Sequence, residues 1–267
     1  MSDRALTDQL WQRLEPLIPA LSRRFRFPGR RRADDRAALE GILFVLATGI
    51  GWNRLPTALF GVSGATCWRR LAEWQSAGVW QRLHEALLAE LRVAGRLDLA
   101  RAIVDSSHVR ALKKGDQTGP SPVDRGRPGS KHHLITDAAG IPLAVIVTGG
   151  NRNDVTQLIP LLHAIPPIRG LVGRPRRRPW RVYGDRGYDH DSHRRLVRAM
   201  GITPVIARRG VPHGSGLGRA RWFVERSFAW LHAFKRLRTR YERRADIHQA
   251  LLSLACTIIC LRHLRDS

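Results

Sequence analysis

The sequence predicts a mixed α/β protein in which a helical segment precedes a five-stranded sheet flanked by helices. Before about residue 95, apolar side chains recur with helical spacing. After Gly95 the pattern changes to short apolar runs separated by turns. A length of 267 residues with 43% hydrophobic content allows one large packed domain or two ordinary ones. We therefore expect a helical domain at 1–95 and an α/β domain at 96–267.

The first 95 residues account for a group of helices. Thr7 is the expected cap of the first helix, which places Leu10, Leu14 and Leu17 on one apolar face. Ser63 is the expected cap of a later helix that follows a tight turn at Gly61. The remaining helices are expected at 35–48, 52–60, 65–76 and 79–93.

The second part predicts strands with helical connections. Asp137–Gly140 is a good hairpin turn, and Pro204 near the start of the last strand suits a sheet edge. Right-handed crossovers can place the strand that ends at Asp185 beside the strand that ends at Asp105. The five strands are expected at 99–105, 133–136, 141–148, 181–185 and 202–207. Helices are expected at 154–164, 191–200, 219–237 and from 246 onward.

The charge is extreme, with a formal net charge of +24 and a pI near 11.7. Only four of the 46 basic residues are Lys, and Arg presents a planar fork that matches phosphate oxygens. A GC-rich genome explains part of the preference for Arg over Lys, but not the surplus of basic over acidic residues. The surplus predicts binding to a polyanion that weakens steeply with salt.

The remaining composition indicates a soluble intracellular protein. Three Cys residues in apolar surroundings suit neither a zinc site nor a disulfide framework, which fits a reducing compartment. The N-terminus lacks the apolar segment of a signal peptide. The longest apolar stretch, 251–261, is shorter than the roughly 20 residues that a membrane span needs.

Three acidic residues stand out: Asp105 and Asp185 after apolar runs, and Glu225 in a segment with helical spacing. Isolated carboxylates at such positions are costly to bury unless they bind something positive. Two divalent cations held by carboxylates activate the attacking oxygen and stabilise the leaving oxygen of a phosphodiester. Asp105 would bridge them, with Asp185 on one and Glu225 on the other. The alternatives are helix caps for the Asp residues and an ion pair with Arg221 for Glu225.

Basic and polar residues predict where DNA binds. The helix from Ser63 to Trp74, after its short turn, suits a recognition helix in the major groove. Its best candidate contacts are Ser63, Thr66, Arg69 and Arg70. Loop and helix cations are expected on the DNA backbone: Lys113, Lys114, Arg127, Lys131, Arg176, Arg177, Arg178, Arg221, Lys235 and Arg236. The alternatives are an ordinary bundle helix and a solvated charged surface.

Several motifs resemble the IS5-family insertion-sequence transposases of the DDE type. The most specific are Tyr183-Gly184-Asp185-Arg186-Gly187-Tyr188-Asp189 and Val224-Glu225-Arg226-Ser227-Phe228-Ala229-Trp230-Leu231. The resemblance covers nearly the whole chain, and includes Trp52–Pro56, Asp105–Ser107, Asp124–His133 and Gly149–Asp154. The pattern departs from the family at Gly218, where a Tyr is usual, and at His232, where a basic residue is usual. Lys235 or Arg236 could substitute for the latter.

The resemblance implies an RNase H-like catalytic domain that cuts and joins DNA at transposon ends. It implies Mg²⁺ as the cofactor, with Mn²⁺ able to substitute. The partners would be the element's terminal inverted repeats and target DNA, with a homodimer or higher oligomer bringing two ends together. Such an enzyme works in the bacterial cytoplasm, on the nucleoid. Two rivals remain: a structure-specific nuclease of the same fold, and a non-catalytic relic that only binds DNA.

Overall fold

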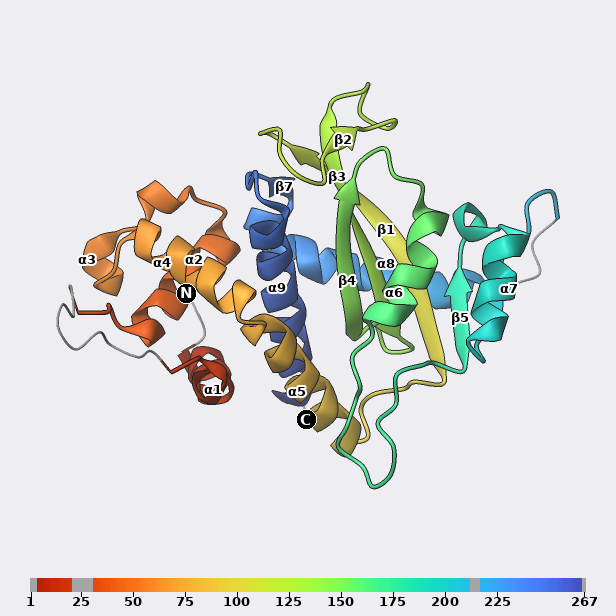
Figure 1. Ribbon diagram of the computed structural model, residues 1–267, viewed down its shortest axis with the longest axis horizontal. Helices are drawn as coiled ribbons and strands as arrows, with labels where there is room; N and C mark the ends of the chain where they lie inside the picture. Colours follow the sequence, from red (N-terminus) through yellow and green to blue (C-terminus); the bar gives the residue numbers. More distant parts are fainter. Residues whose placement is uncertain (1–3, 21–30, 212–216, 266–267) are drawn as a thin grey trace.

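The computed structural model describes residues 4–20, 31–211 and 217–265, with the side chains of 4–6, 217–221 and 223 left out. A group of helices lies on one side and a mixed sheet on the other, with helices α5 and α9 between them (Figure 1). This arrangement confirms the expected fold class.

The helical region follows the predicted pattern with two differences. The first helix begins at Arg4, so Thr7 lies inside it rather than at its cap. The helix expected at 52–60 is interrupted before Pro56, because a residue that precedes proline is disfavoured in helical conformation. The elements are α1 (Arg4–Leu14), η1 (Glu15–Leu17), α2 (Asp35–Thr48), η2 (Trp52–Arg54), α3 (Thr57–Phe60), α4 (Gly64–Ser76) and α5 (Val79–Val93), where η denotes a 3₁₀-helix.

The sheet has a central path β4-β3-β1-β5-β6. Strand β3 is antiparallel to both β4 and β1, whereas β5 is parallel to β1 and to β6. A three-stranded meander followed by two parallel strands is the RNase H-like order that the resemblance implied. The strands are β1 (Arg101–Ala111), β2 (Gly119–Pro120), β3 (Pro128–Asp137), β4 (Pro142–Gly149), β5 (Arg181–Gly184), β6 (Thr203–Ile206) and β7 (Thr239–Arg240).

Three features of the sheet differ from expectation. Strand β3 begins at Pro128 and not at 133, so residues expected in a loop pair with β1 instead. Strand β1 continues to Ala111, so Asp105 lies in the middle of the strand and not at its end. The extension is stabilised by β3, which pairs with β1 from Ala102 to Arg110. The two-residue strands β2 and β7 were not predicted, because segments this short carry no periodic pattern.

Helices cover both faces of the sheet. Helices α6 (Leu158–Ala164) and α7 (Asp191–Ala199) lie on one face, and α8 (Leu217–Ala233) crosses the other, packing against β1, β3 and β5 (Figure 1). Short 3₁₀-helices η3 (Asp154–Gln157) and η4 (Arg186–Tyr188) precede α6 and α7, and η5 (Lys235–Leu237) follows α8. The last helix, α9 (Ala245–Arg265), packs against α4, α5 and β4.

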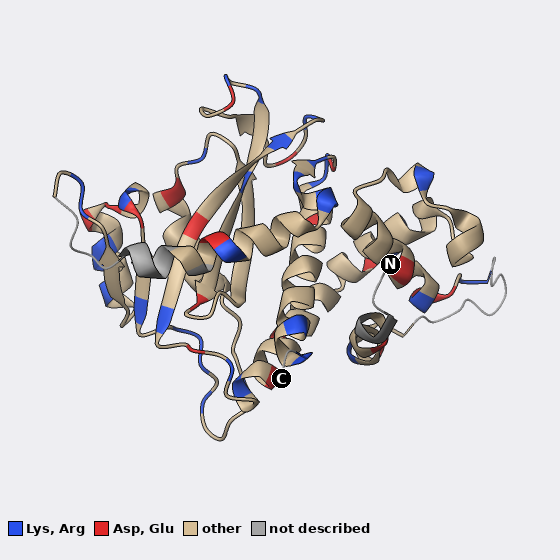
Figure 2. Ribbon diagram, turned by 180° about the vertical axis from the view of Figure 1, so that it is seen from behind, with Lys and Arg blue, Asp and Glu red and all other residues tan. Residues whose placement is uncertain are grey.

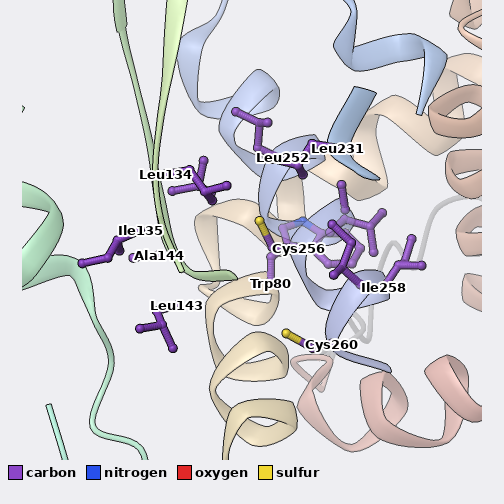
Figure 3. Packing of buried hydrophobic residues seen from close by; sticks show 14 of the residues in the cluster. Trp80, Leu134, Ile135, Leu143, Ala144, Leu231, Leu252, Cys256, Ile258 and Cys260 are labelled. Atoms are coloured by element: carbon purple, nitrogen blue, oxygen red, sulfur yellow. The ribbon is translucent and has the colours of Figure 1, made fainter. Parts of the chain in front are cut away.

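The core is continuous from the helical region to the sheet. Trp80 of α5, Cys256 and Ile258 of α9, and Leu134 of the sheet belong to one buried cluster, in which Cys256 lies next to Trp80 (Figure 3). Helix α9 is long and apolar enough to cross a membrane by length and composition alone, but 72% of its apolar window is buried inside the protein. It is therefore explained as a core helix. A domain division at 95/96 stays a prediction.

Candidate active site

Asp105 and Asp185 come from neighbouring parallel strands at matching positions. The register pairs Arg101 with Arg181 and Ile103 with Tyr183, so two further steps along each chain reach the two acids. Strand β5 ends at Gly184, and a Cβ there would lie 3.2 Å from Cγ2 of Val104, so the side chain of Val104 packs closely over this glycine. The sheet therefore brings two carboxylates that are far apart in sequence to adjacent positions.

Both acids are half-buried and bind backbone amides. The Asp105 Oδ1 accepts a hydrogen bond from the N–H of Ser106 at 2.8 Å. The Asp185 Oδ1 accepts one from the N–H of Gly187 at 2.8 Å, and so caps η4. These hydrogen bonds to the backbone fix the direction of each carboxylate. The bond from Gly187 uses Oδ1 of Asp185 and not Oδ2.

Glu225 is carried across the sheet by α8. Val224, Phe228 and Leu231 are buried and hold this helix against the sheet, while Glu225 is exposed. In Figure 2 the acidic segment of α8 lies next to the acidic segment of β1, and α8 packs against β1. The acid predicted on the helix is thus on the face of the sheet that carries α8.

The donor chemistry of these residues fits a hard divalent cation, because all three offer carboxylate oxygens. Within the described part of the chain, however, no three His, Cys, Asp or Glu side chains lie close enough to hold a metal ion. The three carboxylates are therefore not assembled into a closed cage. Glu225 is exposed and its side chain has three rotatable bonds, so burial constrains its carboxylate less than those of Asp105 and Asp185. The metal-binding role of the three acids stays a prediction.

The structure adds Tyr188 and Asp154, which the sequence analysis did not select. Tyr188 is 1% exposed, and its hydroxyl has no hydrogen-bond partner among the described residues. Burial raises the pKa of Tyr188 well above its usual value, and the charges of Asp105, Asp154 and Asp185 raise it further. A neutral phenol therefore lies among three carboxylates. The available signal was its position three residues after Asp185 in the family motif.

Lys131 binds protein rather than solvent. Its Nζ lies 2.9 Å from Oδ1 of Asp154 and donates to the carbonyl of Arg152 at 2.8 Å, and the residue is 6% exposed. His133 lies on the same side, with Nδ1 3.7 Å from Asp154. Burial lowers the pKa of His133 to about 4, although Asp154 opposes the shift. Lys131 was expected on a loop facing DNA, but in this structure it is buried and neutralises Asp154.

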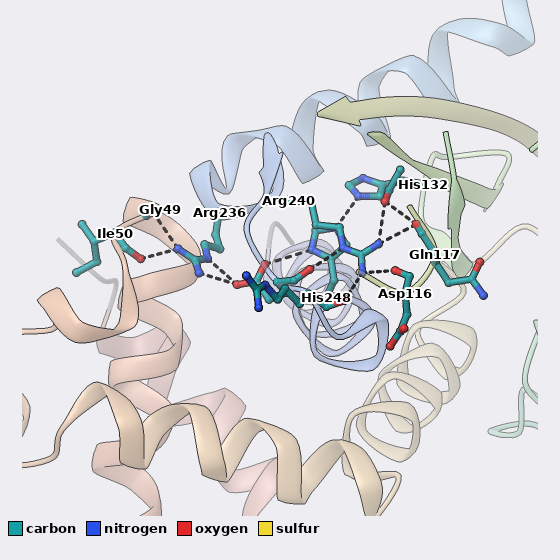
Figure 4. A network of polar contacts seen from close by, with 11 residues as sticks. Gly49, Ile50, Asp116, Gln117, His132, Arg236, Arg240 and His248 are labelled. Atoms are coloured by element: carbon teal, nitrogen blue, oxygen red, sulfur yellow. Dashed lines mark hydrogen bonds and ion pairs between the residues drawn. The ribbon is translucent and has the colours of Figure 1, made fainter. Parts of the chain in front are cut away.

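Two predicted DNA contacts are likewise buried in ion pairs. Arg70 is 7% exposed and reaches Asp35 at 2.6 Å and Glu73 at 2.7 Å. Arg236 is 4% exposed, pairs with Glu242 at 2.6 Å, and donates to the carbonyl of Ile50 at 2.8 Å (Figure 4). Both side chains link elements of the protein, so neither is available to DNA in this arrangement.

The other predicted contacts differ in accessibility and place. Ser63 caps α4 as expected, since its hydroxyl accepts the N–H of Thr66 at 3.3 Å. Arg176, Arg177 and Arg178 are exposed but precede β5, whereas Asp185 follows it, so they lie at the opposite end of that strand. The side chain of Arg221 lies outside the described residues. Among the predicted DNA contacts, the other exposed cations are Arg69, Lys113, Lys114, Arg127 and Lys235.

Comparisons with known proteins match most of the chain to transposases. Residues 6–84 match the family model described as a putative transposase of the IS4/5 family, and residues 97–260 match the transposase DDE domain. The putative transposase for insertion sequence element IS402 of Burkholderia cepacia is 65% identical over 165 residues, which cover 62% of this chain and 76% of that protein. An uncharacterized 16.2 kDa protein of the same element is 52% identical over 123 residues, 46% of this chain and 84% of that protein.

Matches among solved structures include complexes of the Mos1 transposase. The paired-end complex with the left transposon end has a TM-score of 0.38 at 13% identity, covering 97% of this chain and 82% of that one. The strand transfer complex has a TM-score of 0.34 at 11% identity, covering 96% and 84%. On the two family matches and the IS402 relative, the chain belongs to the IS4/5 family of transposases, and residues 97–260 are its DDE domain.

Proposed function

We propose that Asp105, Asp185 and Glu225 hold the divalent cations with which this DDE transposase cuts DNA and joins the cut ends. The observation that carries the proposal is the register of β1 and β5, which brings Asp105 and Asp185 to matching positions, with α8, the helix that carries Glu225, packed on the same strands. Mg²⁺ is the proposed cation, because three carboxylates and water satisfy its preference for hard oxygen ligands. Mn²⁺ would substitute.

Each residue of the proposed site has a different role. Asp105 and Asp185 are oriented by backbone amides, so they form the fixed side of the site. Glu225, on the exposed side of α8, closes over it once DNA is seated. The bound cations supply the activation of a water or 3′-hydroxyl and the stabilisation of the leaving oxygen. Buried Tyr188 stays neutral beneath the acids and fills space that water would otherwise occupy.

DNA would be seated where the helical region meets the sheet. A depression of about 640 Å³ lies there and joins η2 and α4 to Lys113 and Arg243. Trp52 and Trp68 line it, and the Arg244 guanidinium lies 5.5 Å from the ring of Trp68. Cations interleaved with aromatic rings suit phosphate contact and base stacking. Ser63, Thr66 and Arg69 of α4 would approach the major groove beside it.

The proposed reaction implies how many copies of the protein act together and where in the cell they act. Two ends of one element must be joined to one target, so we propose that at least two copies act together on the inverted repeats. The DNA lies in the nucleoid, which places the enzyme in the bacterial cytoplasm.

The test uses Asp105→Asn, Asp185→Asn and Glu225→Gln in the full chain, with end-bearing DNA and Mg²⁺. Each variant should lose on the order of 10³-fold or more in cleavage rate, about 4 kcal/mol of barrier, while DNA affinity stays within about twofold. Asp191→Asn, on the exposed end of α7, is the matched control and should cleave normally. Chelation should stop the wild type, and Mg²⁺ or Mn²⁺ should restore it.

The rivals give other outcomes. Cleavage without transfer of a 3′-hydroxyl end to a target duplex identifies a nuclease. Binding without any cleavage by the wild type identifies a relic. An Asp105→Asn protein that cuts as fast as the wild type overturns the assignment of the site.

A further inference from the structure

The loop between α6 and β5 forms a concave surface that the catalytic site does not use. Its depression of about 800 Å³ is lined by Pro167, Pro175, Trp180 and five arginines. We call these five the arginine cradle: Arg169, Arg174, Arg176, Arg177 and Arg178. All five are exposed.

The cradle gathers five cations around one hollow without a carboxylate among its lining residues. In the part of the chain that the structure describes, none of the five makes an ion pair with a carboxylate. Arg178 donates to the carbonyl of Met200 at 2.7 Å, and the Arg176 guanidinium lies 5.2 Å from the ring of Trp180. Five like charges around one hollow repel each other, so the hollow attracts an anion.

The loop is fixed in shape by contacts with α5. Ile168 and Arg176 exchange two backbone hydrogen bonds, at 2.8 and 3.0 Å, and Ile168 is fully buried. Arg92 of α5 donates to the carbonyl of Ile168 at 2.6 Å. Gly170 has φ of 103°, and a Cβ there would lie 2.5 Å from the carbonyl oxygen of Ala89, so only glycine fits. The cradle is therefore pre-organised, which lowers the entropy cost of binding.

The positive surface continues onto the sheet. Arg101 and Arg181, the first residues of β1 and β5, are paired in the register, and both are exposed. Arg101 has only a loose ion pair, 3.5 Å from Asp98. Figure 2 shows Lys and Arg segments in the loop and at the nearby ends of these strands. The amino ends of the strands are thus basic, and the acids follow further along the same strands.

The separation between cradle and acids follows from strand length. Arg181 to Asp185 is four residues, which is about 13 Å of extended chain. Successive phosphates of one DNA strand advance about 3.4 Å along the helix axis. For a duplex whose axis runs along these strands, a phosphate in the cradle is therefore about four or more nucleotides from a phosphate at the acids.

We propose that the arginine cradle binds the phosphate backbone of duplex DNA at a position separate from the phosphodiester that is cut. Planar guanidinium forks match phosphate oxygens and carry no sequence information, so the site holds DNA in register without selecting bases. The one aromatic ring, Trp180, is already stacked by Arg176, which favours backbone contact over base stacking. The inference rests on the proposed function, because it assigns a second contact to the same substrate.

The first experiment measures affinity against salt. The full-length Arg176→Gln/Arg177→Gln variant is compared with Arg195→Gln/Arg198→Gln, which removes the same charge from exposed positions on α7. The probe is a 30-base-pair duplex of arbitrary sequence, with Ca²⁺ in place of Mg²⁺ to prevent cleavage. The cradle variant should lose about tenfold in affinity, and its slope of log K against log salt should fall by about 1.8, or 0.9 for each lost phosphate contact. Equal losses in both variants overturn the proposal.

The second experiment locates the contact. Single methylphosphonates, which lack the negative charge, are placed along an end-bearing duplex, and cleavage is measured at limiting enzyme. The wild type should show two zones of interference, one at the cut and one about four or more nucleotides away. The cradle variant should lose the outer zone only. A wild type that cleaves with the inner zone alone overturns the cradle, whereas a wild type that neither binds nor cleaves DNA overturns the proposed function instead.

Discussion

Two groups of arginines in this protein have opposite surroundings. In the buried network between the helical region and the sheet, every arginine has partners: Arg236 binds Glu242 and two carbonyls, and Arg240 binds Ser130 and the carbonyls of Asp116 and Gln117 (Figure 4). The arginine cradle has exposed guanidinium groups without carboxylates. The difference teaches that partners decide whether an arginine stabilises the fold or binds a ligand, because the residue type is the same in both groups.

The buried network also contains paired histidines. His132 of β3 and His248 of α9 approach each other with 2.8 Å between their Nε2 atoms, so one ring donates and the other accepts. The Nδ1 of His248 lies 3.5 Å from Oε2 of Glu242. Despite burial, hydrogen bonding from His248 and the charge of Arg236 lower the pKa of Glu242 to about 2. The network therefore keeps one carboxylate ionised inside the protein.

The largest effect on stability is expected from Arg236→Met. The Arg236–Glu242 pair has side chains only 5% and 3% exposed, so removing the cation leaves a buried charge without its counter-ion. The free energy of unfolding should fall by about 3–5 kcal/mol, measured by urea denaturation. The double variant Arg236→Met/Glu242→Gln removes both charges and should recover part of the loss. A single variant as stable as the wild type would show that the network is dispensable.

Acidification should act on the same buried region. Burial lowers the pKa of His84 and of His133 to about 4, so each is neutral in the fold and protonates in the unfolded chain near pH 6.5. Between pH 6.5 and pH 4 the unfolded chain binds protons at these histidines and the folded protein does not. The free energy of unfolding is therefore unaffected above pH 6.5 and falls as the pH drops towards 4, by about 2 kcal/mol for each histidine at pH 5. Asp137, whose pKa burial raises to about 6, works in the opposite direction by about 1 kcal/mol.

Urea denaturation at pH 7 and pH 5 checks this expectation. His84→Gln keeps a donor for the carbonyl of Pro142, which His84 binds at 2.9 Å, and removes the titrating ring. Its loss of stability between the two pH values should be smaller than that of the wild type. The same pH dependence in both proteins contradicts the role of His84.

Arg70→Met should have an intermediate effect. Its partners Asp35 and Glu73 have side chains that are 20% and 33% exposed, so water can solvate them once the guanidinium is lost. We expect a loss of about 1 kcal/mol in unfolding free energy. A loss as large as that of Arg236→Met would erase the distinction between fully and partly buried pairs.

The smallest effect is expected in the cradle itself. Arg177→Gln removes an exposed cation that makes no ion pair among the described residues, so unfolding free energy should change by less than about 0.5 kcal/mol. The same substitution should weaken DNA binding. If it destabilised the fold like Arg236→Met, the contrast between the two groups of arginines would fail.

Much of the fold followed from local pattern. Helix α2 has the expected bounds, because Gly49 adopts φ of 75° at its end, and the hairpin at Asp137–Gly140 forms because Asp137 accepts the N–H groups of Ala139 and Ile141. The strands whose bounds were predicted wrongly depend on contacts between residues far apart in the sequence. Strand β1 continues past Asp105 because β3 pairs with it, and nothing within 106–111 alone predicts this pairing.

The residues of the candidate site also separate into those whose surroundings the sequence predicted and those whose surroundings it did not. The positions of Asp105 and Asp185 followed from strand order and family motifs, and the family itself is confirmed. Burial of Lys131 could not be predicted, because Asp154 is 23 residues away and its carboxylate is placed by η3. Arg236 also donates to the carbonyls of Gly49 and Ile50, which follow α2 and are nearly 190 residues earlier, so the sequence around Arg236 could not indicate these partners. Sequence identifies the charged group, but only tertiary structure identifies its counter-ion.

Helix α9 bears on how the two halves of the chain depend on each other. It is the last helix in sequence, yet it packs against α5 on one side and β4 on the other. A chain nicked by protease near Gly95 should therefore stay together and melt in a single cooperative transition. Either fragment made alone would expose a broad apolar surface and aggregate, and mixing the fragments should restore a soluble particle.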